Sequence, residues 1–247
     1  IQPAVAESWT ISEDALTYVF TLKQGILFTT GKELKAEDAA YCLNRVKGVK
    51  GNPSFLLDTV DTIEATGDYE LTLTLNTPNP SLLSILTRAT FGIYDSEVAK
   101  ANGGTCDEND TFSAYVDANP SIGSGPYQIT AYNSGSEVIL EKNAGSVLRT
   151  GKVDKYVIVN MADVSAQQMA IEAGDIDFAL DLTADQTSLL TESENIQLIS
   201  SKTDDIFFLM LNDNAEYGKE LADEKVREAI TYAIDYTGLC QLAGNGA

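Results

Sequence analysis

FTLKQGILFTTGKELKAEDAAYCLNR, residues 20 to 45, passes from a strand pattern through a polar loop into a helix pattern. Aromatic and β-branched side chains alternate with a period of two over residues 18–22, which is typical of a half-buried strand. Gly25 and Gly31 mark turns in the loop. Apolar residues then recur at i, i+3, i+4 and i+7 across 36–46, so this segment is predicted to be an amphipathic helix.

The start of this predicted helix has an unusual feature. Glu37 and Asp38 lie in its first turn, where negative charge complements the helix macrodipole. Lys35 stands at the N-cap position, and a lysine side chain has no oxygen that could accept the free amide hydrogens. The sequence therefore predicts a helix without its usual N-cap side chain.

Downstream of the helix, the patterns continue as strands with helices between them. Residues 68–76 alternate as a half-buried strand, 81–88 form an apolar helical pattern, and residues around 127–129 and 138–140 read as a hairpin. The polar stretch 101–124 is predicted to be a loop with at most one helical turn. Its acidic run 107–110 lacks the alternating oxygen ligands and central glycine of a calcium loop, so we interpret it as solvated surface.

The pattern after Gly151 changes to strand, helix, strand, which predicts a βαβ unit and therefore a parallel sheet. The predicted elements from here to the end of the chain are strand 153–160, helix 164–173, strand 177–182, helix 184–190, strand 196–199, buried strand 206–211 and helix 223–239.

Composition and charge limit the class of protein. The chain has 247 residues and is 44% hydrophobic, as expected of a folded globular protein of one or two domains. Its 37 acidic and 16 basic residues give a net charge of -21, which disfavours binding to nucleic acid or anionic lipid. No run approaches the roughly 20 apolar residues of a membrane-spanning helix. The start, IQPAVAESWT, lacks a signal-peptide pattern, which fits a cytosolic protein or a chain trimmed before residue 1.

Histidine is absent from the sequence. This removes the usual general base, the usual transition-metal ligand and every Ser-His or Cys-His nucleophile pair, so no metal or cofactor is predicted. The three cysteines, Cys42, Cys106 and Cys240, are too far apart for a zinc knuckle. We interpret them as free thiols, with one disulfide as the alternative.

The opening stretch and the residues before it resemble the signature region of the family 5 extracellular solute-binding proteins, the oligopeptide, dipeptide and nickel receptors of ABC importers. The matching positions are Ile1, Pro3, Ala6, Ser8, Trp9, Ser12, Asp14, Thr17, Tyr18, Phe20, Leu22, Gly25, Phe28, Gly31, Ala36, Glu37, Asp38 and Arg45. Three further blocks agree in order: GSGPY at 123–127 with ILEKN at 139–143, AIEAGDIDFA at 170–179, and VREAITYAID at 226–235. The resemblance covers essentially the whole chain.

The resemblance implies a mixed α/β fold, a periplasmic-binding-protein-like clamshell of type II, of which this chain supplies lobe I. Members of the family are two-lobed and roughly double this length. The implied division is 1–150 as the accessory subdomain of lobe I, 151–212 as its α/β part, and 213–247 as the hinge region and start of a truncated lobe II. The sequence departs from the family where Lys35 replaces a capping Thr and where Thr29-Thr30 replaces His-Asp.

The family's use of its cleft implies a set of ligand-binding candidates. Asp204, Asp205, Ile206 and Phe207 are expected to line the cleft, where backbone groups would pair with an extended ligand. The same comparison selects two residues in each of two loops. These are Asn52 and Phe55 in one loop, and Thr90 and Phe91 in the other. Each of these eight has a structural alternative, either the apolar core or a solvated turn.

The resemblance implies a non-enzymatic receptor that captures a di- or oligopeptide outside the cytoplasm and delivers it to a membrane permease. A nickel-chelate receptor is the alternative within the family, although without histidine a metal would need a carried chelator. A glycosidase using two carboxylates about 5–10 Å apart is an alternative from another class. A structural or adhesion module would need a large apolar patch or repeats. The implied protein is a bacterial monomer, periplasmic or anchored as a lipoprotein.

Overall fold

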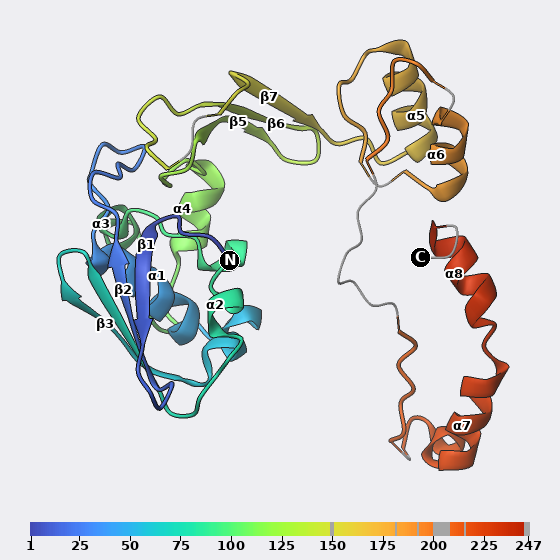
Figure 1. Ribbon diagram of the computed structural model, residues 1–247, viewed down its shortest axis with the longest axis horizontal. Coiled ribbons are helices and arrows are strands. Elements are labelled where there is room, and N and C mark those ends of the chain that lie inside the picture. Colours follow the sequence, from blue (N-terminus) through green and yellow to red (C-terminus); the bar gives the residue numbers. More distant parts are fainter. Residues whose placement is uncertain (149–150, 181, 192, 200–207, 215, 245–247) are drawn as a thin grey trace. The chain divides into compact units, whose positions relative to one another are not determined.

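The structure, a computed structural model, describes residues 1–148, 151–180, 182–191, 193–199, 208–214 and 216–244. The chain divides into two compact units, Ile1–Asn160 and Met161–Ala247 (Figure 1). The first unit extends to Asn160 because β7 (Lys155–Val159) pairs with β6 (Glu137–Lys142) of that unit. The assignment of these segments to lobes stays a prediction.

The first unit contains a four-stranded antiparallel sheet. Its strands lie in the order β1 (Ala6–Ile11), β2 (Thr17–Leu22), β4 (Glu70–Leu75) and β3 (Val60–Gly67). The alternation predicted for β2 and β4 is confirmed, because Phe20 lies opposite Leu71 and Tyr18 opposite Leu73, and all four side chains are buried. Cross-strand apolar pairs of this kind fix the register of the sheet.

Two strands of this sheet, β1 and β3, do not follow a simple two-residue period. The pairing register shifts between Ala6 and Ser8 in β1 and between Val60 and Thr62 in β3. A bulge turns successive side chains out of strict alternation, so the buried residues of β3, Val60 and Ile63, lie three positions apart. The sequence pattern therefore did not predict these two strands.

Helix α1 (Ala36–Gly48) packs against β3 and β4 and supplies part of the main core (Figure 1). Its extent confirms the predicted helix. Lys35 gives no side-chain cap, but the Asp38 carboxylate accepts a hydrogen bond of 3.0 Å from the Lys35 amide. The helix start is therefore stabilised from the third helical position, which is the second half of a capping box.

Short helices extend the first unit beyond the sheet. Helix α2 (Leu82–Ile85) is shorter than the predicted 81–88. Helix α3 (Ser96–Ala101) was not predicted, although the Asp95 side chain caps its Glu97 and Val98 amides. The polar stretch 101–124 contains a two-turn helix, α4 (Phe112–Ala118). Its Phe112 is buried in a second apolar cluster with Tyr41, Cys42, Ala99 and Ile122.

A second sheet of three antiparallel strands ends the first unit, in the order β5 (Tyr127–Asn133), β6 and β7. The hairpin β5–β6 confirms the prediction for 127–140. Strand β7 forms within the predicted 153–160, but the predicted βαβ unit does not form in the described residues. β7 pairs antiparallel with β6, and residues 177–180 and 182 have no strand structure. Every residue of β7 is exposed, so this strand is not the buried type that a parallel sheet requires.

The second unit is helical in its described residues. Helices α5 (Val164–Ala173) and α6 (Ala184–Leu190) confirm the predictions, and η3 (Lys219–Ala222), α7 (Glu224–Ala233) and α8 (Tyr236–Gly244) follow. The predicted helix 223–239 is two helices, because Ile234 has extended backbone angles of φ -80° and ψ 126°. No helix in the described parts of the chain is long and apolar enough to cross a membrane.

The predicted strands of the second unit do not form in its described residues. Residues 177–180, 182, 196–199 and 208–211 have no strand structure, whereas 181, 206 and 207 lie outside the described residues. A strand needs a neighbour to satisfy its backbone groups, and the described part of 161–244 contains none. Phe178 and Phe208 are accordingly 75% and 73% exposed.

Candidate functional site

Four of the predicted ligand-binding residues were expected to line a cleft where a ligand adds as a strand. Asp204, Asp205, Ile206 and Phe207 all lie outside the described residues, so their role stays a prediction.

The first pair of loop candidates lies on a short 3-10 helix, η1 (Asn52–Leu57), which follows α1. Pro53 favours the start of this turn because its fixed φ angle suits the first helical positions. Leu57 is fully buried and anchors the turn in the main core. Asn52 is exposed, and Phe55 has 61% of its surface exposed. Both side chains are therefore accessible to a ligand.

The second pair lies on another 3-10 turn, η2 (Ala89–Phe91). Thr90 is exposed, but Phe91 is only 6% exposed and belongs to the main core. The structure thus separates the two residues of this pair, with Thr90 at the surface and Phe91 inside. Both η1 and η2 contact α1. A ligand-binding role for any of the four stays a prediction.

A cluster of charged residues that sequence reasoning did not select lies near the start of α1. We call Lys32, Asp38, Asp95, Ser96 and Glu97 the Lys32 cluster. The Lys32 Nζ atom lies 2.7 Å from Asp38 Oδ1, 3.5 Å from Asp95 Oδ1 and 3.3 Å from Glu97 Oε1. Asp38 also accepts hydrogen bonds from the Ser96 amide at 3.1 Å and the Ser96 hydroxyl at 2.6 Å.

The Lys32 cluster fixes the ionisation of its two central groups. Burial alone would raise the pKa of Asp38, but hydrogen bonds from Lys32 and Ser96 outweigh it and hold the pKa below its ordinary value. Burial alone would lower the pKa of Lys32, and the Asp38 carboxylate reverses this and raises it. Both groups are therefore charged at neutral pH. The buried Asp38 carboxylate therefore has a structural role, since its oxygens already accept hydrogen bonds from protein groups.

A second ion pair joins α1 to the acidic segment 107–110. Asp110 accepts hydrogen bonds from Arg45 Nε at 2.7 Å and Arg45 Nη2 at 2.5 Å, and its side chain is 3% exposed. The interpretation of this segment as solvated surface is therefore wrong for Asp110. Arg45 also donates to the Tyr94 hydroxyl at 3.1 Å and lies 5.3 Å from the Phe112 ring centroid. No local pattern could reveal this pair, because the residues are 65 positions apart.

The cysteines are free: Cys42 is buried, and Cys106 and Cys240 are exposed. Burial raises the pKa of Cys42 to about 12, so its thiol is neutral and unreactive at physiological pH. No grouping of three or more potential metal ligands exists among the described residues.

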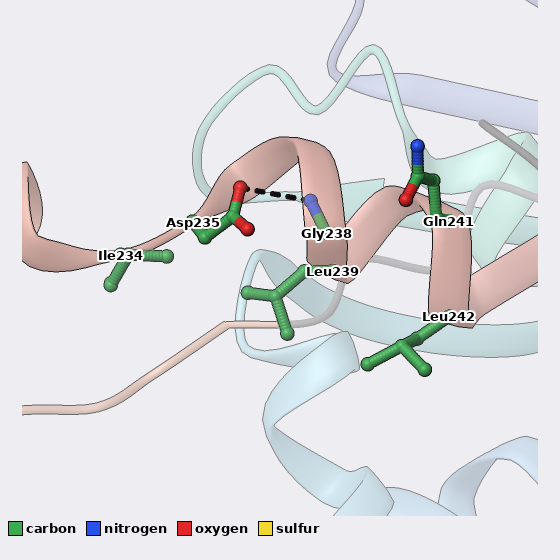
Figure 2. Close-up of a pocket in the computed structure, with 6 residues that line it drawn as sticks. All are labelled: Ile234, Asp235, Gly238, Leu239, Gln241 and Leu242. Carbon is green, nitrogen blue, oxygen red and sulfur yellow. Dashed lines mark hydrogen bonds between the residues drawn. The ribbon is translucent and has the colours of Figure 1, made fainter.

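The described residues line a surface hollow in each unit. One lies in the second unit and is lined by Ile234, Asp235, Gly238, Leu239, Gln241 and Leu242. Figure 2 shows Leu239 and Leu242 projecting from the same side of α8, with the Asp235 carboxylate accepting a 2.9 Å hydrogen bond from the Gly238 amide. The lining side chains come from one short stretch of chain, so this hollow is a helix surface with little enclosure.

The other hollow lies in the first unit between the end of α4 and the edge strand β5. Its lining includes Thr30, Tyr115, Asp117, Ser121 and Tyr132. Asp117 and Tyr132 are exposed, and Thr30 and Ser121 hydrogen-bond to protein groups. Neither hollow is lined by any of the four candidates that the structure describes, Asn52, Phe55, Thr90 and Phe91.

Comparison with known proteins finds relatives that are named for binding glutathione or dipeptides. The glutathione-binding protein GsiB of Salmonella typhi is 24% identical over 249 residues, which cover all of this chain and 46% of the relative. The dipeptide-binding protein DppE of Bacillus subtilis is 25% identical over 252 residues, which cover 95% of this chain and 44% of the relative. The chain thus spans about half the length of the curated relatives it matches.

Solved structures give the same fold. NikZ from Campylobacter jejuni, solved with Ni(L-His), superimposes with a TM-score of 0.80 at 23% identity over 97% of this chain and 46% of its own. DppA from Helicobacter pylori, solved with the peptide STSA, gives a TM-score of 0.76 at 21% identity over 99% and 50%. These likenesses confirm the mixed α/β fold of type II periplasmic binding proteins, with the chain covering about half of each.

The family model described as "Bacterial extracellular solute-binding proteins, family 5 Middle" matches residues 1–247, the full extent of the sequence. The chain belongs to the family 5 bacterial extracellular solute-binding proteins.

Proposed function

We propose that this chain is part of the extracytoplasmic substrate-binding component of an ABC importer, and that its ligand is a di- or oligopeptide. The observation that carries the proposal is the family match across residues 1–247. Among the relatives, GsiB is named for glutathione and DppE for dipeptides. AppA of Bacillus subtilis, with a TM-score of 0.76 over 96% of this chain, was solved with a nonapeptide.

A receptor of this type works by a population shift. Ligand that contacts both lobes stabilises a closed conformation, and the membrane permease recognises that conformation. The chain would contribute one side of such a cleft, with the exposed residues Asn52, Phe55 and Thr90 as candidate contacts. Backbone groups near residues 204–207 would pair with an extended peptide as an added strand.

The partners and location follow from the same proposal. The protein would act outside the cytoplasm as a monomer, in the periplasm or anchored as a lipoprotein, and would dock on a permease. Capture and release require no covalent chemistry, so we propose that it is not an enzyme. A nickel chelate is a second candidate ligand because NikZ was solved with Ni(L-His), and the chelator would supply the imidazole that this sequence lacks.

The test is ligand-dependent thermal stability of a version extended to the length of the relatives, alongside the chain itself. Di-, tri- and oligopeptide pools are compared with Ni²⁺ alone and Ni²⁺ with L-histidine. A ligand at 100 times its Kd stabilises the folded state by about 2.7 kcal/mol, which raises Tm measurably. A shift with peptides alone supports the proposal, whereas a shift only with the nickel chelate supports the alternative. Hydrolysis of added peptide or glycoside would contradict a pure receptor.

A further inference from the structure

The turn at residues 28–33, inside the stretch that identifies the family, is attached to a segment far away in the sequence. The Thr29 amide donates a 2.9 Å hydrogen bond to the Gly123 carbonyl, and the Thr29 hydroxyl donates at 2.7 Å to the Ser121 carbonyl. The turn is tightly closed by a 2.9 Å bond from the Phe28 amide to the Lys32 carbonyl. Its position therefore determines where residues 121–123 lie.

The same turn is held on its other side by the Lys32 cluster. Lys32 Nζ contacts three carboxylates, two of which, Asp38 and Asp95, are 1% and 3% exposed. The Thr30 hydroxyl donates to Asp95 Oδ2 at 2.7 Å. Asp95 is itself tied to the distant segment, because its amide donates to the Ile122 carbonyl at 3.3 Å. The cluster and the turn thus contact 121–123 together.

Residues 121–123 lead directly into the three-stranded sheet. The Ser121 hydroxyl accepts a 3.2 Å hydrogen bond from the Ile129 amide on β5, and Tyr94 forms an isolated antiparallel bridge with Gly123. Ser124 is buried. Strand β5 therefore begins directly after a segment that is fixed to the body of the first unit. The partners of this segment include the 28–33 turn, the residues before α3 and, through Ile122, the second apolar cluster.

Lys32 is the residue on which this arrangement depends. Among the described residues it is the cation that pairs with Asp38, Asp95 and Glu97, and its side chain is 27% exposed. Removing its charge would leave two buried carboxylates without a counter-ion, which strongly favours opening of the site to water. The main apolar core includes Phe28 at the start of the turn but none of residues 29–33, 95–98 or 121–131, so opening of those segments does not require global unfolding.

We propose that the ion pairs of Lys32 with Asp38, Asp95 and Glu97, which we call the charge latch, hold together the 28–33 turn, the start of α3 and residues 121–131. When these ion pairs are lost, the three segments open together as one local unit. Lys32 is a positioning residue here, acting on β5 through Asp95 and Thr29. The latch sets the placement of the β5–β7 sheet on the body of the first unit.

Hydrogen–deuterium exchange of the chain tests the latch. In Lys32→Met, peptides covering 28–35, 94–98 and 121–131 should exchange together, about tenfold faster or more than in the wild type, which corresponds to roughly 1.4 kcal/mol of local opening free energy. Peptides from β2 and β4 should keep their protection. Lys32→Arg keeps the charge and should largely restore protection at all three segments.

Lys35→Met is the matched control, because Lys35 pairs with Asp68 at the surface, where the two side chains are 44% and 72% exposed. It should leave 121–131 unchanged. Thr29→Val is the milder second variant, and it should open 121–131 without affecting the start of α1. Unchanged protection of 121–131 in both Lys32→Met and Thr29→Val would overturn the proposal. So would uniform acceleration that includes β2 and β4, since it would show a general loss of stability.

Discussion

Arg45 on α1 and Asp110 before α4 form a two-point ion pair, with Arg45 Nε donating to Asp110 Oδ2 and Arg45 Nη2 to Oδ1. The carboxylate also accepts from the Thr105 amide at 2.9 Å and the Phe112 amide at 3.3 Å. The pair therefore connects the end of α1 to the loop that carries α4. Because Phe112 belongs to the second apolar cluster, this connection also positions that cluster.

Replacing Arg45 by Met should destabilise the first unit strongly. The Asp110 side chain is 3% exposed, and a buried charge that loses its partner costs about 3–5 kcal/mol, with less expected here because Arg45 is partly solvated. Urea unfolding followed by tyrosine fluorescence would measure the loss. Lys100→Met is the control, because its pair with Glu37 is exposed and should contribute at most about 1 kcal/mol. Equal losses in both variants would contradict the structural role of the pair.

The free energy of unfolding should fall at acid pH because the carboxylates of Asp38 and Asp110 become protonated. The pKa values of Asp38 and Asp110 lie below their ordinary value of 3.8, as hydrogen bonds from Lys32 and Ser96, and from Arg45, outweigh burial. The folded state thus binds fewer protons than the unfolded state, so the stabilisation is present above pH 3.8 and is lost as the pH falls through the folded-state pKa values. Urea midpoints between pH 7 and pH 2.5 would show this. In Arg45→Met the acid-dependent loss should be smaller, and an identical profile would exclude Asp110 as a source.

Gly48→Ala should destabilise the first unit through a steric clash. A Cβ at this position would meet the Cys106 carbonyl group, and backbone atoms there cannot rotate away as a side chain can. Overpacking of this kind costs about 1–3 kcal/mol. Gly51→Ala is the matched control, because its nearest atom outside the neighbouring residues is Pro53 Cδ at 3.7 Å. If the Gly48→Ala protein is as stable as the Gly51→Ala protein, residues 106–107 can shift away from α1 without loss of stability.

The sequence predicted those elements whose pattern is set locally. Strand β2 and helix α1 follow their periodicity because one face of each is buried. Helices α5 and α6 begin where the side chains of Asp163 and Thr183 cap their first amides. Strands β1 and β3 were missed because bulges shift their register. The strand predicted at 177–182 failed in its described residues for a different reason. An apolar run specifies a strand only where neighbouring strands can pair with it.

The candidate site was less predictable than the fold. The Lys32 cluster and the Arg45–Asp110 pair join residues that are distant in the sequence, and no spacing rule connects such positions. Thr90 and Phe91 are adjacent in the chain, yet one is exposed and the other buried. Resemblance to a family indicates which segment lies near the ligand. Tertiary packing then decides which side chains of that segment are exposed to the ligand and which are buried.

Phe55 and Phe91 therefore provide a direct test of the predicted contacts. Phe91→Ala should cost about 3–5 kcal/mol of stability, since it removes a ring that is 6% exposed from the main core. Phe55→Ala should change stability by no more than about 0.5 kcal/mol, because its ring is 61% exposed. In a version extended to the length of the relatives, Phe55→Ala should instead weaken peptide binding, measured by calorimetry at a temperature where both variants are folded. If Phe55→Ala binds peptide as tightly as the wild type, η1 is not part of the ligand site, and the exposure of Phe55 must have another cause.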